Sequence, residues 1–232
     1  MVIIGLIPAR GGSKGVPGKN IALCAGRPLL AYTAEAALAA KCLDRVILST
    51  DDDAIANVGR ECGLEVPFLR PAGLATDKAN SLGVIVHALD WLESQGSVVD
   101  AIVLLQPTSP MRTAHHIDEA VGLFQAQKPD ALVSVVEVPH HYHPNALMRL
   151  EHDALVPVVA ATEMVLRRQD VSPLYARNGP SILILSASQI RSGSFYSGVT
   201  APYVMSQHDS LDIDTSEDLA VAAAYRAKSS PA

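Results

Sequence analysis

The sequence has few aromatic residues and few cysteines. Of its 232 residues, 4% are aromatic and three are cysteine, namely Cys24, Cys42 and Cys62. An odd number of cysteines without Cys-x-x-Cys spacing argues against a disulfide framework or a zinc site. No apolar run reaches the length of a transmembrane helix, and no basic segment precedes the first apolar run. We therefore expect a reduced, cytoplasmic protein without a signal peptide or membrane span.

Positive charge is also scarce. The chain carries 18 Lys and Arg against 24 Asp and Glu, a formal net charge of -6. Without a basic stripe, general nucleic-acid binding is excluded as a function class. The length fits one domain, residues 1–232, with a substantial core.

The positive charges that are present gather in one early loop. Residues 8–20 read Pro-Ala-Arg-Gly-Gly-Ser-Lys-Gly-Val-Pro-Gly-Lys-Asn and follow an apolar run at 2–7. Their cations are Arg10, Lys14 and Lys19. Glycine-rich backbone can turn its N–H groups toward a ligand, so the loop predicts a polyanion site, most simply for a nucleotide triphosphate. It matches neither the Walker A motif nor Gly-x-Gly-x-x-Gly, which disfavours an oxidoreductase.

Strand-like apolar runs alternate with helical patterns along most of the chain. Strands are expected at 2–7, 45–49, 65–69, 101–105, 131–138 and 181–185. Helices are expected at 28–40, 53–62, from 81, around 117–124, near 186–191 and from 216 to about 228. Right-handed crossovers then predict a doubly wound, mostly parallel α/β sheet. The loops at Arg10, Arg70 and Gln106 each follow a strand and should converge on one site.

A pair of acidic residues lies late in the chain. Asp212 and Asp214 alternate along an extended segment, so both carboxylates point to one face. Two oxygen ligands so close together suit Mg²⁺ completed by substrate phosphates. On the residues alone, they could equally belong to the N-terminus of the helix that follows.

Three segments resemble the CMP-sialic acid synthetase family, the acylneuraminate cytidylyltransferases. Residues 7–20 are similar almost throughout to that family's loop, Ile-Pro-Ala-Arg-Gly-Gly-Ser-Lys-Gly-Ile-Pro-x-Lys-Asn. Residues 106–112 resemble its Gln-Pro-Thr-Ser-Pro-Leu-Arg, and residues 211–219 its metal-binding Asp-x-Asp-Thr segment. The resemblance implies a Rossmann-like fold of nucleotidyltransferase type. It also implies that CMP moves from CTP to an acidic acceptor, with release of pyrophosphate.

The resemblance also implies roles for individual residues. The nucleotide site comprises Ala9, Arg10, Gly11, Gly12, Lys19, Asn20, Arg70, Ala79 and Ser81. The expected acceptor contacts are Gln106, Arg112, Arg168, Gln169, Asn178 and Asp212. Asp212 and Asp214 would bind Mg²⁺; the alternative is that one of them accepts the proton. Catalysis would rest on Arg10, Lys14, Lys19 and Asp214, through positioning and charge neutralisation. Judged alone, Arg70 and Gln106 could simply be polar residues at strand ends, and Arg112 a surface residue.

Residues 139–180 depart from the alternating pattern. They suggest an arm of short strands that serves dimerisation and acceptor binding, so a homodimer is expected. His140, His141 and His143 lack the flanking ligands of a zinc site and read as a polar loop.

The acceptor itself stays open. Where the family usually continues Asn-Gly-Ala-hydrophobic-Tyr, residues 178–182 read Asn-Gly-Pro-Ser-Ile. The leading prediction is a sialic-acid-like nonulosonic acid. The alternatives are 3-deoxy-octulosonate, a small phosphonate, or a non-catalytic nucleotide-binding protein, which Asp212, Asp214 and Lys19 argue against.

Overall fold

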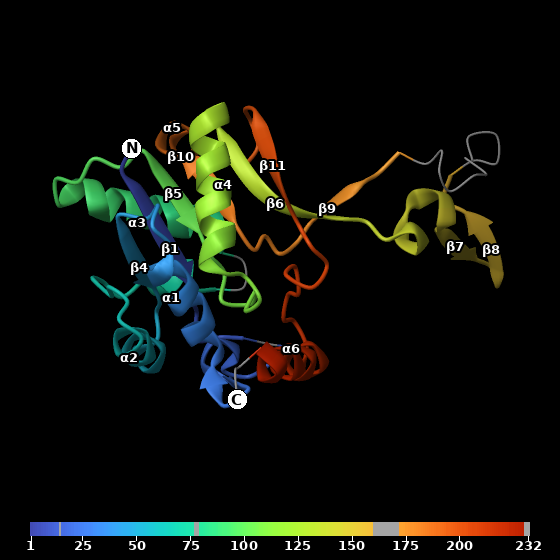
Figure 1. The fold of residues 1–232 in the computed structure, drawn as a ribbon, viewed down its shortest axis with the longest axis horizontal. Coiled ribbons are helices and arrows are strands. Elements are labelled where there is room, and N and C mark those ends of the chain that lie inside the picture. Colours follow the sequence, from blue (N-terminus) through green and yellow to red (C-terminus); the bar gives the residue numbers. More distant parts are fainter. Residues whose placement is uncertain (14, 77–78, 160–171, 230–232) are drawn as a thin grey trace.

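A mixed sheet forms the centre of the computed structural model, which describes residues 1–13, 15–76, 79–159 and 172–229 (Figure 1). Within these residues the sheet has seven strands. They are β1 (Ile3–Pro8), β4 (Arg45–Ser49), β5 (Ala101–Leu104), β6 (Ala131–Glu137), β9 (Tyr175–Arg177), β10 (Leu183–Ser186) and β11 (Thr200–Met205). Their order is β11-β6-β10-β5-β1-β4, and β9 pairs with β6.

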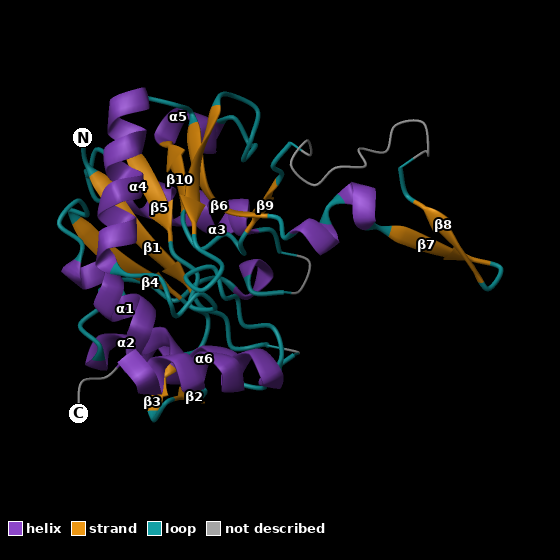
Figure 2. Ribbon diagram, turned by 45° about the vertical axis from the view of Figure 1, so that its right-hand side comes forward, coloured by secondary structure: helices purple, strands orange, loops and turns teal. Residues whose placement is uncertain are grey.

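Helices cover both faces of this sheet (Figure 2). One face packs against α1 (Leu29–Ala39), α2 (Asp53–Glu61) and α4 (Ala114–Gln127). The other packs against α3 (Ser81–Ser94) and α5 (Ala187–Arg191). In β1, Ile3 and Ile7 join the first core cluster, whereas Ile4 and Leu6 join the second. Because strand side chains alternate between faces, a strand buried on both sides reads as an unbroken apolar run. The doubly wound, mostly parallel sheet is thus confirmed.

Two strand predictions need correction, and one strand was missed. The strand expected at 181–185 begins at Leu183 and runs antiparallel to both β5 and β6. The one expected at 65–69 makes only isolated bridges, at Glu65 and Leu69. β11 was not predicted, because Pro202 interrupts its run and Val204 is exposed, so neither an apolar run nor clean alternation marks it.

The last helix closes the structure beside the early loop. α6 (Ser216–Ser229) contacts β2 (Leu23–Cys24), which pairs with β3 (Arg27–Pro28) after the turn η1 (Lys19–Ile21). A small core of Cys24, Leu29, Tyr32, Ile213 and Ala222 joins these segments. The segment that precedes α6 is therefore held next to the glycine-rich loop.

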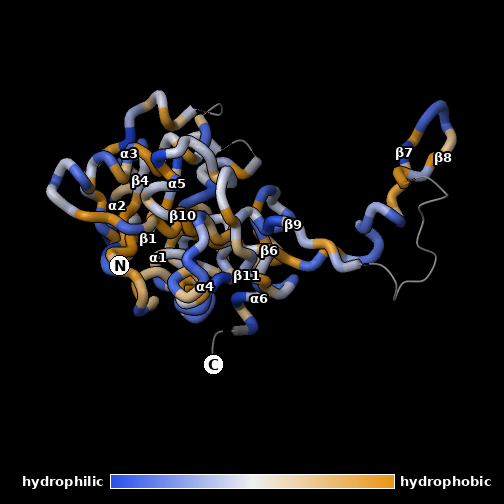
Figure 3. The backbone as a smooth tube through the Cα atoms, turned by 90° about the horizontal axis from the view of Figure 1, so that it is seen from above, coloured by the Kyte–Doolittle hydropathy of each residue, from blue (hydrophilic) through white to orange (hydrophobic). Residues whose placement is uncertain are grey.

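The arm projects from the main body, as Figures 1 and 3 show. It contains the turns η3 (His140–Tyr142) and η4 (Pro144–Ala146) and the hairpin of β7 (Met148–Glu151) and β8 (Ala154–Pro157). Leu150 and Leu155 on this hairpin are 71% and 66% exposed. Its part in dimerisation stays a prediction. None of the helices that the structure describes is long and apolar enough to cross a membrane.

Candidate active site

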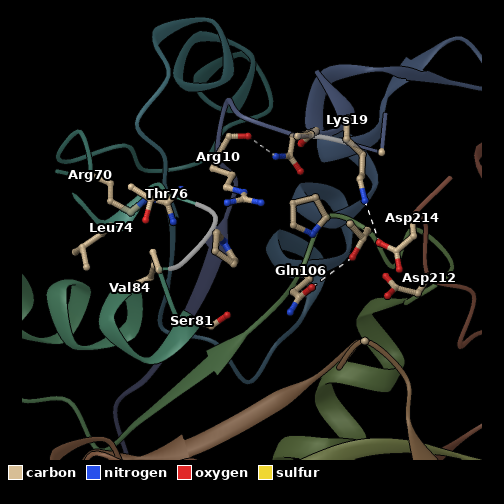
Figure 4. Close-up of a pocket in the computed structure, with 18 residues that line it drawn as sticks. Arg10, Lys19, Arg70, Leu74, Thr76, Ser81, Val84, Gln106, Asp212 and Asp214 are labelled. Atoms are coloured by element: carbon tan, nitrogen blue, oxygen red, sulfur yellow. Dashed lines mark hydrogen bonds and ion pairs between the residues drawn. The ribbon is translucent and has the colours of Figure 1, made fainter. Parts of the chain in front are cut away.

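A cavity of about 650 Å³ lies beyond the carboxyl ends of β1 and β5 (Figure 4). That volume suits a nucleotide-sized ligand, and the position is the usual one for ligands in open α/β sheets. Its lining includes Arg10, Lys19, Asn20, Arg70, Ala79, Ser81, Gln106, Asp212 and Asp214 from the predicted site. The three loops and the acidic pair thus meet in one place, as predicted.

Arg70 forms one end of the cavity, together with Leu74 of the turn η2 (Ala72–Leu74), Thr76 and Val84 (Figure 4). Arg70 is buried, and its Nη2 lies 3.4 Å from Asp51 Oδ1. The same carboxylate oxygen accepts a hydrogen bond of 3.2 Å from the Gly11 amide. Burial lowers the pKa of Arg70, although Asp51 partly opposes the shift. Asp51 therefore ties Arg70 to the glycine-rich loop.

The early loop crosses the middle of the cavity. Arg10 extends into it in Figure 4, and the Arg10 carbonyl accepts a hydrogen bond of 2.9 Å from Asn20 Nδ2. Ala9, Gly11 and Gly12 do not line the cavity: Ala9 is fully buried, and its amide donates to the Ser49 carbonyl. These three residues shape the loop and do not form the cavity wall. Lys14 lies outside the described residues.

At the other end of the cavity, the loop meets the acidic segment. Lys19 Nζ lies 3.1 Å from Asp214 Oδ1 and donates a 2.7 Å hydrogen bond to the Ile213 carbonyl. Ile213 is fully buried, and its amide donates to the Thr108 carbonyl at 2.9 Å. With Ile213 buried in the core, the alternation of extended backbone turns both flanking aspartates toward the cavity. Gly15 completes the contact, since a Cβ there would collide with the Asp214 carbonyl.

The two aspartates differ in environment. Asp214 is 79% exposed. Asp212 is half-buried, and its Oδ1 has no hydrogen-bond partner among the described residues. Burial raises the pKa of Asp212, and the Asp214 charge adds to that rise, while a hydrogen bond with Thr108 opposes it. An unsatisfied carboxylate oxygen beside a second carboxylate is a donor set for a hard divalent cation. The part of the chain that the structure describes holds no cluster of three or more His, Cys, Asp or Glu suited to a metal.

Two predicted acceptor residues lie behind the cavity wall. Arg112 is 1% exposed and donates to Gln106, Ser181 and Thr33, so we correct its assignment as an acceptor contact. Asn178 is also buried, because its side chain bonds Ser134 and Ser210 inside the core. Arg168 and Gln169 lie outside the described residues.

Several cavity residues were not predicted. Ser13, Leu74, Thr76, Val84, Pro107, Thr108 and Gly179 also line the wall. Thr108 lies inside the segment at 106–112, so reading that motif as a continuous wall would have found it. Gly179 adjoins Asn178, and a Cβ there would lie 3.3 Å from the Asp212 carboxylate.

The comparison with protein families agrees with this geometry. Residues 4–222 match the family described as Cytidylyltransferase. The chain belongs to the cytidylyltransferase family. It is therefore a nucleotidyltransferase enzyme.

Relatives of this cytidylyltransferase span most of its length. The CMP-N,N'-diacetyllegionaminic acid synthase of Legionella pneumophila is 37% identical, over 95% of this chain and 94% of the relative. The pseudaminic acid cytidylyltransferase of Campylobacter jejuni is 30% identical, over 92% and 91%. The N-acylneuraminate cytidylyltransferase of Streptococcus agalactiae is 34% identical over 92% of this chain, which spans about half (50%) of that longer protein.

Solved structures share the fold of this cytidylyltransferase. A CMP:2-keto-3-deoxy-manno-octonic acid synthetase complexed with CTP matches with a TM-score of 0.72 at 13% identity, over 98% of this chain and 99% of the other. A 4-diphosphocytidyl-2C-methyl-D-erythritol synthase from Anaerococcus prevotii matches with a TM-score of 0.60 at 13% identity, over 97% and 96%. At such identity the likeness concerns the fold alone, and it confirms the Rossmann-like nucleotidyltransferase architecture.

Asp212→Asn should stabilise the ligand-free protein. A folded-state pKa that is raised gives stability below the unfolded pKa of about 3.9, and that stability is lost as pH rises through the folded pKa. The asparagine variant avoids this loss. Its melting temperature should match that of the wild type near pH 3.5 and exceed it at pH 7.5. The difference should be about 2–4 °C for each kcal/mol by which the substitution raises the free energy of unfolding.

The matched control is Asp153→Asn, at an exposed carboxylate in the turn between β7 and β8, away from the cavity, which should leave the melting temperature at pH 7.5 unchanged. A pH 7.5 melting temperature for Asp212→Asn below that of the wild type would contradict the assignment of Asp212 as a desolvated carboxylate.

Proposed function

We propose that this cytidylyltransferase moves CMP from CTP onto a sialic-acid-like nonulosonic acid and releases pyrophosphate. The observation that carries the proposal is the contact between Lys19 and Asp214, which places a cationic loop and an acidic pair around one cavity. Three relatives are named for legionaminic, pseudaminic and acylneuraminic acids, and these names support the acceptor class.

In this proposal the glycine-rich loop holds the triphosphate. Arg10 and Lys19 balance its charge, and Lys14 is expected to assist. The acceptor oxygen attacks the α-phosphorus, and the bond from that phosphorus to the bridging oxygen of pyrophosphate breaks in line. Such transfers depend mainly on positioning and on neutralising charge in a partly dry cavity. Arg10 and Lys19, which both line the cavity, supply that neutralisation from the chain itself.

The base and ribose would occupy the end of the cavity formed by Arg70, Ala79 and Ser81, with Asn20 between them and the phosphates. Arg70 is held by Asp51, so its guanidinium offers fixed donors to the base. Fixed, partly desolvated donors reject a base with the wrong acceptor pattern because they would be left unpaired.

Asp212 and Asp214 would hold Mg²⁺, since one offers an unsatisfied buried oxygen and the other an exposed carboxylate at the same wall. When bound, the ion would screen the α-phosphate and lower the pKa of the acceptor hydroxyl. Lys19 would keep Asp214 in place and contact phosphate oxygens from the same Nζ.

The acceptor would lie between Gln106, Gly179 and Asp212. Arg168 and Gln169 remain predicted acceptor contacts. We also propose a cytoplasmic homodimer in which the arm at 139–180 joins the subunits, because its hairpin exposes Leu150 and Leu155. Exposed apolar side chains on a projecting hairpin are typical of an interaction surface.

Lys19→Ala should impair CTP use far more than stability. Loss of a charge-assisted contact to phosphate should raise the KM for CTP about 10- to 100-fold. The melting temperature should fall only a few degrees, and Lys41→Ala, at an exposed surface site, should change neither value. Steady-state kinetics and thermal unfolding measure both. A large fall in melting temperature with an unchanged KM would assign Lys19 a structural role instead.

Pyrophosphate release tests the acceptor class. With CTP and Mg²⁺, we expect turnover with N,N'-diacetyllegionaminic, pseudaminic or N-acetylneuraminic acid. A wrong acceptor that leaves polar groups unpaired should lower kcat/KM at least about 10-fold, which is our expectation for 3-deoxy-octulosonate and 2-aminoethylphosphonate. Asp214→Asn should abolish the release. Turnover confined to octulosonate or phosphonate would overturn the acceptor assignment, and no release with any of these would refute the proposed function.

A further inference from the structure

Arg112 is a buried cation without a counter-charge. It is 1% exposed, and among the described residues no carboxylate pairs with it. Burial lowers its pKa to about 9, and the nearby Arg226 adds to the shift. Its Nε finds no hydrogen-bond partner in the described part of the chain. A buried, unpaired guanidinium contributes less to stability than an apolar side chain of similar size would. We therefore look for the role of Arg112 in the segments that it positions.

The guanidinium joins three distant parts of the chain. Arg112 Nη1 donates to the Gln106 carbonyl at 3.1 Å and to the Ser181 carbonyl at 2.7 Å. Arg112 Nη2 donates to Thr33 Oγ1 in α1 at 2.7 Å, and that hydroxyl donates in turn to the Gln106 carbonyl at 3.4 Å. The end of β5, helix α1 and the segment before β10 are thus fixed to one planar group.

Two of these partners determine the shape of the acceptor end of the cavity. Gln106 lines the cavity, and so does Gly179, two residues before Ser181. Gly179 lies against the Asp212 carboxylate, since a Cβ there would be 3.3 Å away. Asn178 holds the same turn from its other end, because its Oδ1 accepts from the Ser181 amide at 3.2 Å. The turn at 178–181 is therefore clamped between Asn178 and Arg112.

The cations that would bind CTP are held by contacts of their own. Lys19 is held by Ile213 and Asp214, and Arg70 by Asp51. Among the described residues, the side-chain hydrogen bonds of Arg112 reach Gln106, Ser181 and Thr33 but none of the residues in these contacts. A change at Arg112 should therefore disturb Gln106 and the turn at 178–181 more than it disturbs Lys19 and Arg70.

We propose that Arg112 is a positioning residue whose guanidinium sets the separation of Gln106 from the turn at 178–181, and so the width of the acceptor subsite. This inference rests on the proposed function, because it assigns the acceptor to that end of the cavity. It depends on the planar fork of donors, which a lysine ammonium does not reproduce.

A pair of mild variants tests the inference. Thr33→Val keeps the shape of the side chain but removes the hydroxyl that bonds Arg112 and Gln106, whereas Thr33→Ser keeps that hydroxyl. Thr33→Val should raise the KM for N,N'-diacetyllegionaminic acid about 3- to 10-fold, the effect of one lost hydrogen bond, and leave the KM for CTP within about twofold. Thr33→Ser should restore the acceptor KM.

Arg112→Lys should raise the acceptor KM more than Thr33→Val does and should also lower kcat, again with little change in the KM for CTP. Arg191→Lys is the matched control, since Arg191 bonds Asp90 and Glu93 on the surface of α3. Equal rises in the KM for the acceptor and the KM for CTP would mean a merely structural role. The same holds for an unchanged acceptor KM combined with a smaller fraction of active enzyme. A wild-type acceptor KM in Arg112→Lys would show that charge alone suffices and would overturn the inference.

Hydrogen exchange gives a readout that does not depend on turnover. In Thr33→Val, relative to Thr33→Ser, the amides of residues 105, 106, 108 and 181–183 should exchange faster, while those of residues 9–13 and 18–20 should not change. If no acceptor supports turnover in the wild type, the proposed function fails and this exchange pattern alone decides the inference. Equal exchange rates at these amides in Thr33→Val and Thr33→Ser would contradict the inference.

Discussion

The contact of Lys19 with Asp214 and the Ile213 carbonyl is the constraint on which the site depends. It joins residues 195 positions apart, one in the loop after the first strand and one just before the last helix. Ile213 anchors the acidic segment in the core from below, and Thr108 holds its amide. Residues that are distant in sequence thus bring opposite charges to one wall of the cavity.

The cavity concentrates positive charge in a protein that is acidic as a whole. The net charge is -6, yet Arg10, Lys19 and Arg70 all face one cavity. For a ligand in the cavity, these nearby charges outweigh the average charge of the surface. The low-dielectric walls strengthen the attraction of the nearby cations, whereas solvent and salt screen the distant acidic groups. The half-buried Asp212 is the unfavourable element that a bound cation would offset.

The sequence predicts the nucleotide side of the site better than the acceptor side. The glycine-rich loop and the acidic pair are local patterns, and each is placed by a buried strand or residue that can be recognised from periodicity. Arg112 shows the limit: within its motif it resembles an anion contact, but its burial depends on Thr33 and Ser181, which are distant in sequence. The direction of β10 was equally hidden, since an apolar run has the same pattern in either orientation.

Calorimetric titration of CTP with and without Mg²⁺ tests the central claim most directly. If the cationic loop and the acidic pair form one site, Mg²⁺ should tighten CTP binding in the wild-type protein. The Asp212→Asn/Asp214→Asn double variant should bind CTP with the same affinity whether or not Mg²⁺ is present. A Mg²⁺-dependent gain in affinity that survives in the double variant would contradict the account.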